Sequence, residues 1–383
     1  MKTVKLYDTD SMLGSTECTV LECVKSENGY KAVLDKTVFF PEGGGQTADT
    51  GVIGDAAVLD VREENGEIYH YITAPLEEGH TYTASINFDE RFDKMQNHSG
   101  EHIVSGIVNK KYGYNNVGFH LSDNEVTLDF DGPLTRRELD EIEILANAAI
   151  HKNTTITAYY PDKDELGTIP YRSKLELTDN VRLVVIDGYD ICACCAPHVK
   201  STGQIGVIKL LNCEKHKNGV RIYMKCGMRA VKDYQVKYRN NAEISALLCA
   251  RADETADAVR NLQNENERLK YEIIGLKRRV MDLKCENIGS SDGNICIIDS
   301  GISADDMRYC AGRMVERCRV FGIFSQTDKG FSYVCASSHT DMREFGKRLN
   351  AALSGKGGGT AAMIQGSVAA DEGAIIRFFE TNN

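Results

Sequence analysis

Two short stretches of the chain carry paired residues that can bind a metal ion. His98 and His102 are four positions apart in "NHSGEHIVSG", and on a helix this spacing places both imidazoles on one face. Cys194 and His198 are also four apart, and Pro197 restricts the backbone between them. Two nitrogens from one element, with a sulfur and a nitrogen from another, make a tetrahedral set that suits Zn²⁺ better than Mg²⁺ or Ca²⁺. The sequence therefore predicts a zinc site.

Each pair also has an ordinary interpretation. Two histidines four apart on a helix are often surface or core residues, and a lone Cys-x-x-x-His pair is a weak signal. Both pairs occur in a chain with only nine histidines, which favours the metal site. Glu101 lies directly before His102, so the His-Glu-x-x-His order of metalloproteases is absent from the sequence, and a peptidase is not expected.

A glycine-rich stretch, "FFPEGGGQTADTG" at residues 39–51, is a second candidate site. Gly43, Gly44 and Gly45 would weaken a strand, but they allow positive φ and a close approach of the backbone to a ligand. Gln46 follows with an amide that both donates and accepts hydrogen bonds. These four residues are candidates for binding a substrate, and a plain loop is the alternative.

Composition limits the class of protein. The 383 residues can form two or three domains, and 42% hydrophobic with 26% charged residues is typical of globular proteins. The sequence contains no membrane-spanning stretch and no apolar signal region, so its thirteen cysteines are expected to be reduced thiols in a cytoplasmic protein. The net charge of −11 argues against a polyanionic partner, but basic clusters at 277–284, 313–319 and 343–348 favour one, unless they are only solvated helix faces.

The elements that must position these residues form an α+β protein. Residues 1–90 read as strands recurring at roughly ten-residue intervals, which predicts a β-barrel-like subdomain or a sandwich. Residues 91–228 mix both types: one helix carries both histidines and ends at Gly113, and Thr135 with Glu138 begins another with a capping box. A hairpin is expected to turn at Asn218-Gly219.

The segment 229–286 contains no proline and is expected to form one long helix. A heptad pattern predicts a coiled-coil homodimer through residues 259–283, in which β-branched a and leucine d residues favour two strands and Asn266 sets the register. A helix packed on its own domain is the alternative. The a and d residues are Val259, Leu262, Asn266, Leu269, Ile273, Leu276, Val280 and Leu283. The charged g-to-e′ pairs are Glu265 with Lys270 and Glu272 with Lys277, which attract, and Arg279 with Lys284, which repel.

The last segment, 287–383, reads as a small α/β domain of three strands and two helices followed by a glycine-rich turn at 355–368. A phosphate-binding role for that turn is weakly supported, because the sequence after it lacks a Walker lysine. The expected domains are thus 1–90, 91–228, 229–286 and 287–383.

In combination, these motifs resemble a known family. The order of "FFPEGGGQTADTG", His98-x-x-x-His102, "VRLVVIDGYDICACCAPHVKSTGQIG" and a final glycine-rich domain resembles the AlaX family, the free-standing relatives of the alanyl-tRNA synthetase editing domain. The resemblance spans nearly the whole chain and is closest to the long form. It implies an editing domain of the threonyl/alanyl-tRNA synthetase second-additional-domain type at 91–228, and a DHH-associated domain that binds tRNA at 287–383.

The resemblance also assigns site residues. It places Gln46 near the aminoacyl end of the substrate. The synthetase motif Cys-Gly-Gly-Thr-His is here "CCAPH" at residues 194–198, which keeps the metal spacing but loses the threonine and both glycines. Cys192 or Cys195 therefore stays open as a competing ligand. One zinc ion per chain is implied, with the ligands His98, His102, Cys194 and His198.

The implied activity is a trans-editing hydrolase that cuts the ester between serine or glycine and the 3′ end of tRNA(Ala), a second sieve after the synthetase. Zinc would hold the substrate or activate water. Glu101 and His120 are weak candidates for a general base and read better as structural residues. No ATP-dependent aminoacylation is expected, because the synthetase core would have to precede this chain. The alternatives are a zinc-stabilised tRNA-binding adaptor without turnover and a deacylase for another misacylated tRNA.

Overall fold

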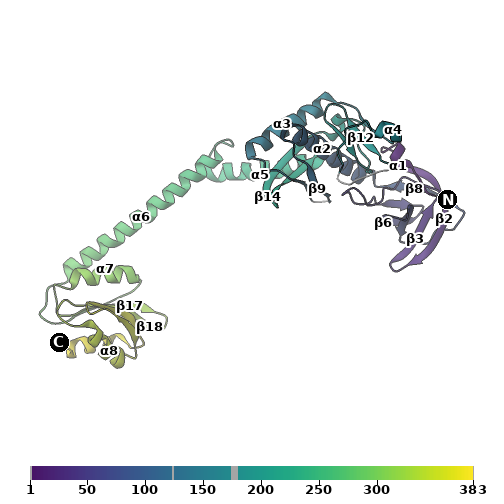
Figure 1. Cartoon of the computed structure of the whole chain (residues 1–383). Coiled ribbons are helices and arrows are strands. Elements are labelled where there is room, and N and C mark those ends of the chain that lie inside the picture. The colour runs from purple at the N-terminus through teal and green to yellow at the C-terminus, as the bar shows by residue number, and fades with distance from the viewer. Residues whose placement is uncertain (1, 123–124, 174–179, 383) are drawn as a thin grey trace. The chain divides into compact units, whose positions relative to one another are not determined.

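A computed structural model of the chain describes residues 2–122, 125–173 and 180–382. Its helices and strands are labelled in Figure 1. By internal contacts the chain divides into two compact units, Met1–Ala242 and Glu243–Asn383. The mixture of helices and strands that the sequence predicts is confirmed. The finer division at residues 90, 228 and 286 stays a prediction.

The first unit begins with a barrel of short antiparallel strands (Figure 1). Side chains alternate between inside and outside; on β7, for example, Ile68, His70 and Ile72 are buried. The β6–β7 turn has positive φ at both Asn65 and Gly66, as a tight two-residue hairpin requires. In barrel order the strands are β2 (Ser15–Ser26), β3 (Gly29–Leu34), β7 (Glu67–Ile72), β6 (Ala56–Glu64), β5 (Gly51–Ile53) and β8 (Thr81–Ile86). Before and beside them lie β1 (Val4–Lys5), α1 (Leu6–Thr9) and β4 (Lys36–Thr37).

Helix α2 (Phe88–Tyr112) follows the barrel and is buried over most of its length. It ends as predicted at Gly113, which has a left-handed φ of 74° and donates its N–H to Asn109. Arg91 near its start is fully buried and forms an ion pair with Asp49 of the barrel loop. A buried charge needs such a partner. The pair therefore fixes the glycine-rich loop against the helix that carries the two histidines.

Two further sheets complete this unit. The helix α3 (Arg136–Lys152) has the predicted capping box between Thr135 and Glu138, and it packs with α2 against the larger sheet (Figure 1). The β14–β15 hairpin is present, but its central turn residues are Lys217 and Asn218, so the expected position of the turn was wrong by one residue. The larger sheet contains β14 (Ile208–His216), β15 (Gly219–Cys226), β10 (Val126–Phe130) and β9 (Asn116–Leu121); the smaller contains β11 (Ile156–Tyr159), β12 (Leu183–Ile186) and β13 (Asp190–Ala193), with α4 (Lys163–Leu166) and the 3₁₀ turn η1 (Thr202–Ile205) nearby in sequence.

The long helix expected at 229–286 is two helices, α5 (Gly227–Leu248) and α6 (Thr255–Asn287), so the prediction of one continuous helix was wrong. Cys249 has a left-handed φ of 50°, and the Ser245 hydroxyl donates to the Ala250 carbonyl, which closes the end of α5. No glycine or proline marks this break, and for that reason the sequence pattern misses it. The whole heptad pattern lies on α6, and its apolar a and d side chains are exposed in the single chain. The coiled coil and the dimer stay predictions.

The predicted charge pairs of α6 have partners within the chain. Glu265 and Glu272 both pair with Arg268 on their own helix. Lys284, which would meet a like charge across a parallel dimer, forms an ion pair with Asp299 of the same unit. Exposed pairs of this kind are worth about 0–1 kcal/mol each, so they compete only weakly with pairing between helices.

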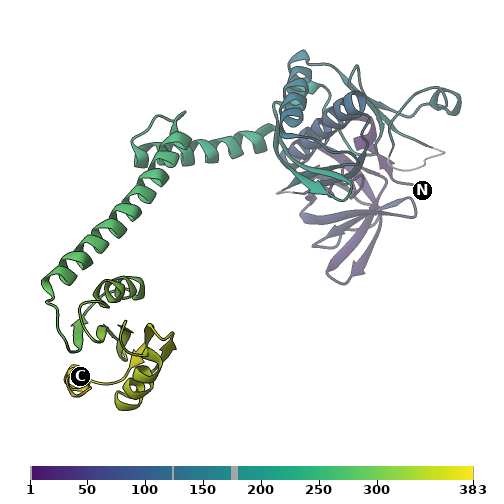
Figure 2. The same cartoon turned by 60° about the vertical axis from the view of Figure 1, so that its left-hand side comes forward.

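The second unit ends in a five-stranded sheet with helices on both faces (Figure 2). Tyr333 and Cys335 face one hydrophobic cluster, whereas Val334 and Ala336, which alternate with them on β18, face the other. The glycine-rich segment expected to form a turn is an antiparallel strand pair, in which a Cβ at Gly357 would lie 2.7 Å from the Gly366 Cα. In sheet order the strands are β16 (Ile295–Asp299), β17 (Phe321–Thr327), β18 (Gly330–Ala336), β20 (Met363–Val368) and β19 (Lys356–Gly359); the helices are α7 (Ala304–Met314), α8 (Met342–Ala352) and α9 (Glu372–Thr381). Among the residues described, none of the helices combines the length and apolar character that crossing a membrane requires.

Candidate metal centre

Helix α2 presents His98 and His102 from its buried middle, and two glycines of the same helix allow this burial. A Cβ at Gly100 would lie 2.4 Å from Cys226 Sγ, and a Cβ at Gly106 would lie 2.3 Å from the Tyr189 carbonyl oxygen. Only glycine permits such close approach. The segment that leads into β13 can therefore pack directly against α2 near the histidines, and β15 can pack against the opposite face of the helix.

The segment after β13 supplies the other two residues of the site. Arg182, directly before β12, donates from Nη1 to the carbonyl oxygens of Cys194 and Ala196, at 3.0 and 2.8 Å. Ser11 donates to the His198 carbonyl at 2.6 Å. These three hydrogen bonds to alternate carbonyls, two of them buried, restrict the backbone of this loop. The positions of Cys194 and His198 are thereby fixed relative to α2.

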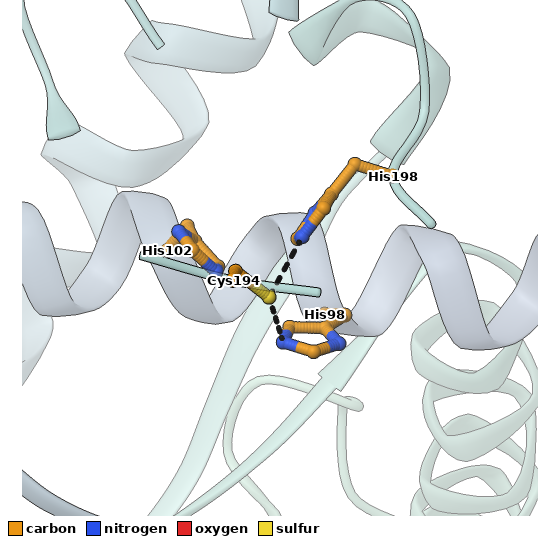
Figure 3. Close-up of side chains that lie close together, drawn as sticks. All are labelled: His98, His102, Cys194 and His198. Atoms are coloured by element: carbon orange, nitrogen blue, oxygen red, sulfur yellow. Dashed lines mark hydrogen bonds between the residues drawn. The ribbon is translucent and has the colours of Figure 1, made fainter. Parts of the chain in front are cut away.

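The four residues that the sequence selects come together. The candidate ligand atoms of His98, His102, Cys194 and His198 all lie within 4.8 Å of one another. Figure 3 shows the Cys194 sulfur between the imidazoles, with His98 Nε2 at 3.5 Å and His198 Nε2 at 3.4 Å. All three histidines are buried, and Cys194 is partly exposed. Residues from α2 and from the β13 loop, far apart in sequence, thus form one compact group.

The outward-facing nitrogen of each imidazole is also engaged. Nδ1 of His98 lies 3.1 Å from Gln46 Oε1, Nδ1 of His102 lies 2.9 Å from Asp190 Oδ2, and Nδ1 of His198 lies 3.0 Å from Ser99 Oγ. An oxygen acceptor at Nδ1 favours the tautomer whose proton is there, which leaves the Nε2 lone pair directed inward. This is the arrangement in which imidazoles bind metal ions.

The charges in the group favour a thiolate. Burial alone raises the pKa of the Cys194 thiol, but the adjacent His98, His102 and His198 outweigh it and hold that pKa well below its ordinary value. Burial lowers the pKa of His102, but the Asp190 carboxylate raises it well above the ordinary value. Burial lowers the pKa of His198 to about 3. A deprotonated sulfur is the form that ligates metals.

The glycine-rich turn lies beside this group. Gly43 and Gln46 exchange backbone hydrogen bonds of 3.1 and 3.0 Å, and Gly44 and Gly45 between them have φ of 61° and 83°, values suited to a type I′ turn. A Cβ at Gly44 would lie 3.9 Å from His98 Cε1. Gln46 is buried, and its Nε2 has no hydrogen-bond partner within the part of the chain that the structure describes. Substrate binding by these four residues stays a prediction.

The other candidates differ in their surroundings. Glu101 is buried, accepts hydrogen bonds from Ser105 and Asn116, each at 2.6 Å, and places Oε2 3.7 Å from His102 Nε2. His120 is exposed on β9. Cys192 forms a second group with His102 and Asp190, and Cys195 belongs to neither group of described residues that could hold a metal.

Sequence reasoning missed three residues around the histidines. Asp190 opens the cysteine-rich stretch and could have been noted as an acidic residue beside two cysteines. Ser99 directly follows His98, but nothing in the sequence pairs it with His198. Arg172, which binds Asp190, has no sequence signal at all, because only the fold brings its segment to β13.

Known proteins support the assignment of a family. The family model described as the threonyl and alanyl tRNA synthetase second additional domain matches residues 181–223, from β12 into β15. The alanyl-tRNA editing protein Aarsd1 of Danio rerio is 27% identical over 93% of this chain and 92% of its own length. The alanyl-tRNA editing protein AlaX-L of Pyrococcus horikoshii is 28% identical over 96% of this chain and 95% of its own length. Among solved structures, the C-Ala domain of Aquifex aeolicus alanyl-tRNA synthetase is 22% identical and covers 24% of this chain and 93% of its own, with a TM-score of 0.21. The full-length relatives and the matched domain agree with the motifs, and they confirm the resemblance of this chain to the AlaX family of alanyl-tRNA editing proteins.

Proposed function

We propose that the protein is a trans-editing hydrolase that removes serine or glycine from mischarged tRNA(Ala), at a site with one Zn²⁺ per chain. The observation that carries the proposal is the convergence of three imidazoles and one sulfur within 4.8 Å. Relatives that match nearly the whole chain are named alanyl-tRNA editing proteins, which supports a deacylase.

The donor set fits zinc. His98, His102 and His198 would bind through Nε2 and Cys194 through its thiolate, a combination of nitrogen and sulfur that zinc prefers and that Mg²⁺ and Ca²⁺ do not. The Nδ1 partners of the histidines supply the outer hydrogen bonds that such ligands require. When bound, zinc supplies a Lewis acid that polarises an ester carbonyl or water.

The chain's own residues would orient the aminoacyl group. Gln46 accepts from His98 through Oε1, so its Nε2 is left to donate to the substrate. Gly44, Gly45 and Cys195 are exposed, and Gly44 lies beside both His98 and Cys195, so we infer that the 3′ end of the tRNA reaches the site from this side. Without side chains on the turn, the nucleotide can approach the backbone closely.

The remaining assignments extend this proposal. We propose that the second unit contacts the body of the tRNA through its basic residues, and that two chains associate through residues 259–283 of α6. The exposed apolar stripe on α6 supports the dimer, because a helix that is alone in water does not gain from exposing leucines at every d position.

A panel of charged tRNAs tests the activity. The purified protein is incubated with seryl-, glycyl- and alanyl-tRNA(Ala) and with seryl-tRNA(Ser) and seryl-tRNA(Thr), and the remaining ester is measured. We expect the wild type to hydrolyse only seryl-tRNA(Ala) and glycyl-tRNA(Ala). A Cys194→Ala variant should hydrolyse neither. A zinc-loaded protein that cleaves none of them supports the adaptor alternative, whereas cleavage of the correctly charged seryl-tRNA(Ser) shows that the protein does not select tRNA(Ala). Cleavage of seryl-tRNA(Thr) in place of the two mischarged tRNA(Ala) esters supports a deacylase for another misacylated tRNA.

A further inference from the structure

Of the three histidines, His102 has the most elaborate support. Arg172 donates to Asp190 through two parallel hydrogen bonds, from Nε to Oδ1 at 2.7 Å and from Nη2 to Oδ2 at 2.8 Å. The same Oδ2 lies 2.9 Å from Nδ1 of His102. The paired geometry of guanidinium and carboxylate leaves the carboxylate little rotational freedom. Asp190 can therefore hold the plane of the His102 ring.

The backbone fixes both members of the pair. Arg172 donates its N–H to the Ile191 carbonyl at 2.8 Å and accepts from the Ala193 N–H at 2.9 Å, so it extends the sheet beside β13. Asp190 opens β13 and pairs with Ile186 of β12. Hydrogen bonds on both sides place the two side chains before any ligand binds. Their order, from Arg172 to Asp190 to His102, is set by the fold.

The other two histidines are supported differently. Gln46 offers a neutral amide oxygen to His98, and Ser99 offers a hydroxyl to His198. Among the described residues that contact Nδ1 of these imidazoles, Asp190 alone is a carboxylate. A carboxylate partner makes the opposite ring nitrogen a stronger metal ligand and fixes its direction.

We propose that Asp190 and Arg172 are positioning residues that orient His102 toward the metal ion. This inference rests on the zinc site of the proposed function. Asp190 contacts the candidate metal ligand His102, and Arg172 reaches this histidine through Asp190. The pair therefore controls how tightly and with what geometry the metal is held.

The chain contains a matched control pair. Arg221 and Asp129, on β15 and β10, have the same two hydrogen bonds of 2.7 and 2.8 Å, and Asp129 belongs to neither metal-holding group of the described residues. Asp190 and Arg172 are 2% and 18% exposed, compared with 14% and 34% for the control pair. Breaking either pair removes the same contacts, but only one pair supports a histidine of the site.

The experiment uses the full chain with Asp190→Asn, Arg172→Met and the controls Asp129→Asn and Arg221→Met. Zinc affinity is measured by competition with a chelating dye, and the ligand geometry by the visible absorption of Co²⁺. We expect the zinc dissociation constant to rise about 10- to 100-fold for Asp190→Asn and less for Arg172→Met, with a changed cobalt spectrum in both. Both controls should bind as the wild type does, and Arg172→Lys, which keeps one charged donor, should recover part of the affinity.

Two failures can be told apart. A wild-type protein that binds no zinc overturns the metal centre and this inference with it. A wild-type protein that binds zinc, with folded Asp190→Asn and Arg172→Met variants that keep its affinity and its cobalt spectrum, overturns the inference alone. If Asp190→Asn does not fold, Arg172→Met decides the question, because its side chain is less buried.

Discussion

Gln46 and His98 are 52 positions apart in sequence, and Oε1 of Gln46 lies 3.1 Å from Nδ1 of His98. One residue belongs to the glycine-rich turn and the other to α2, so the turn that is expected to bind substrate also touches a candidate metal ligand. The amide has two ends, and the other end, Nε2, is buried without a hydrogen-bond partner among the described residues. Gln46 can thus join metal binding to substrate binding.

Variants of Gln46 separate these two roles. Gln46→Glu keeps an oxygen that accepts from His98 but loses the N–H donor, whereas Gln46→Ala loses both. We expect Gln46→Glu to keep one zinc per chain while its deacylation rate falls about 5- to 100-fold, the effect of a lost hydrogen bond of roughly 1–3 kcal/mol. Gln46→Ala should lose zinc affinity as well. Wild-type deacylation by Gln46→Glu contradicts the role of the donor.

The ligand set is tested by zinc content. Cys194→Ala and His102→Ala should each reduce bound zinc from one per chain to well below one, because three ligands hold the ion much less tightly than four. Cys195→Ala is the matched control: this thiol is adjacent in sequence but lies outside the four-residue group. Zinc is measured by atomic absorption after dialysis. Full zinc content in Cys194→Ala would refute the ligand set. Loss of zinc from Cys195→Ala would show that Cys195, and not Cys194, supplies the sulfur ligand.

Gly45 tests the turn. Its φ of 83° disfavours any other residue, and a Cβ there would lie 2.7 Å from the Phe119 carbonyl oxygen. Gly79 has a similar φ of 78°, with no atom within 4 Å of a Cβ. Each change to alanine should lower the free energy of unfolding by about 1–2 kcal/mol through φ alone. Gly45→Ala should lower the free energy of unfolding by more than Gly79→Ala does, and it should also slow deacylation, because the turn must move. If the two variants have the same stability in urea unfolding and the same deacylation rate, this prediction is contradicted.

The sequence predicts what depends on local pattern and misses what depends on tertiary contact. The histidine spacing, the Thr135 capping box and the helix end at Gly113 are all local, and the structure contains each of them. The contact between Ser99 and His198 depends on how the β13 loop packs on α2. The break at Cys249 requires a left-handed φ at a residue that does not favour it, and no propensity indicates such a position.

His70 predicts a pH dependence of stability. It is fully buried in the barrel, its Nδ1–H donates to the Ala32 carbonyl, and its Nε2 accepts from the Thr37 hydroxyl, so the neutral ring fits the site. Burial lowers its pKa to about 4. In the unfolded chain His70 has an ordinary histidine pKa of about 6.5, so it binds a proton below that pH. In the folded chain it does not bind this proton until the pH is near 4. Stability therefore falls as the pH falls from about 6.5 to about 4.

The size of this effect follows from the shift. Between pH 7 and pH 5, His70 should reduce the free energy of unfolding by about 2 kcal/mol. Urea unfolding of the wild type and of His70→Gln at both values measures it, because the comparison cancels what other groups contribute. His70→Gln should be less stable at pH 7 but should lose about 2 kcal/mol less on acidification. Equal losses in the two proteins contradict the assignment of a neutral, buried histidine.

The exposed stripe of α6 predicts the oligomeric state. Leu269 and Leu276 are 44% and 60% exposed in the single chain, and both occupy d positions. Tyr271 is 76% exposed but lies at an outer f position of the same helix. If α6 pairs with a second copy, lysine at either leucine places a charge in the seam, whereas lysine at Tyr271 stays in water. Sedimentation at micromolar concentration should therefore give a dimer for the wild type and for Tyr271→Lys. The double variant that carries both Leu269→Lys and Leu276→Lys should be a monomer. If the wild type is a monomer, the predicted dimer is wrong. If the double variant is still a dimer, the interface does not lie on α6.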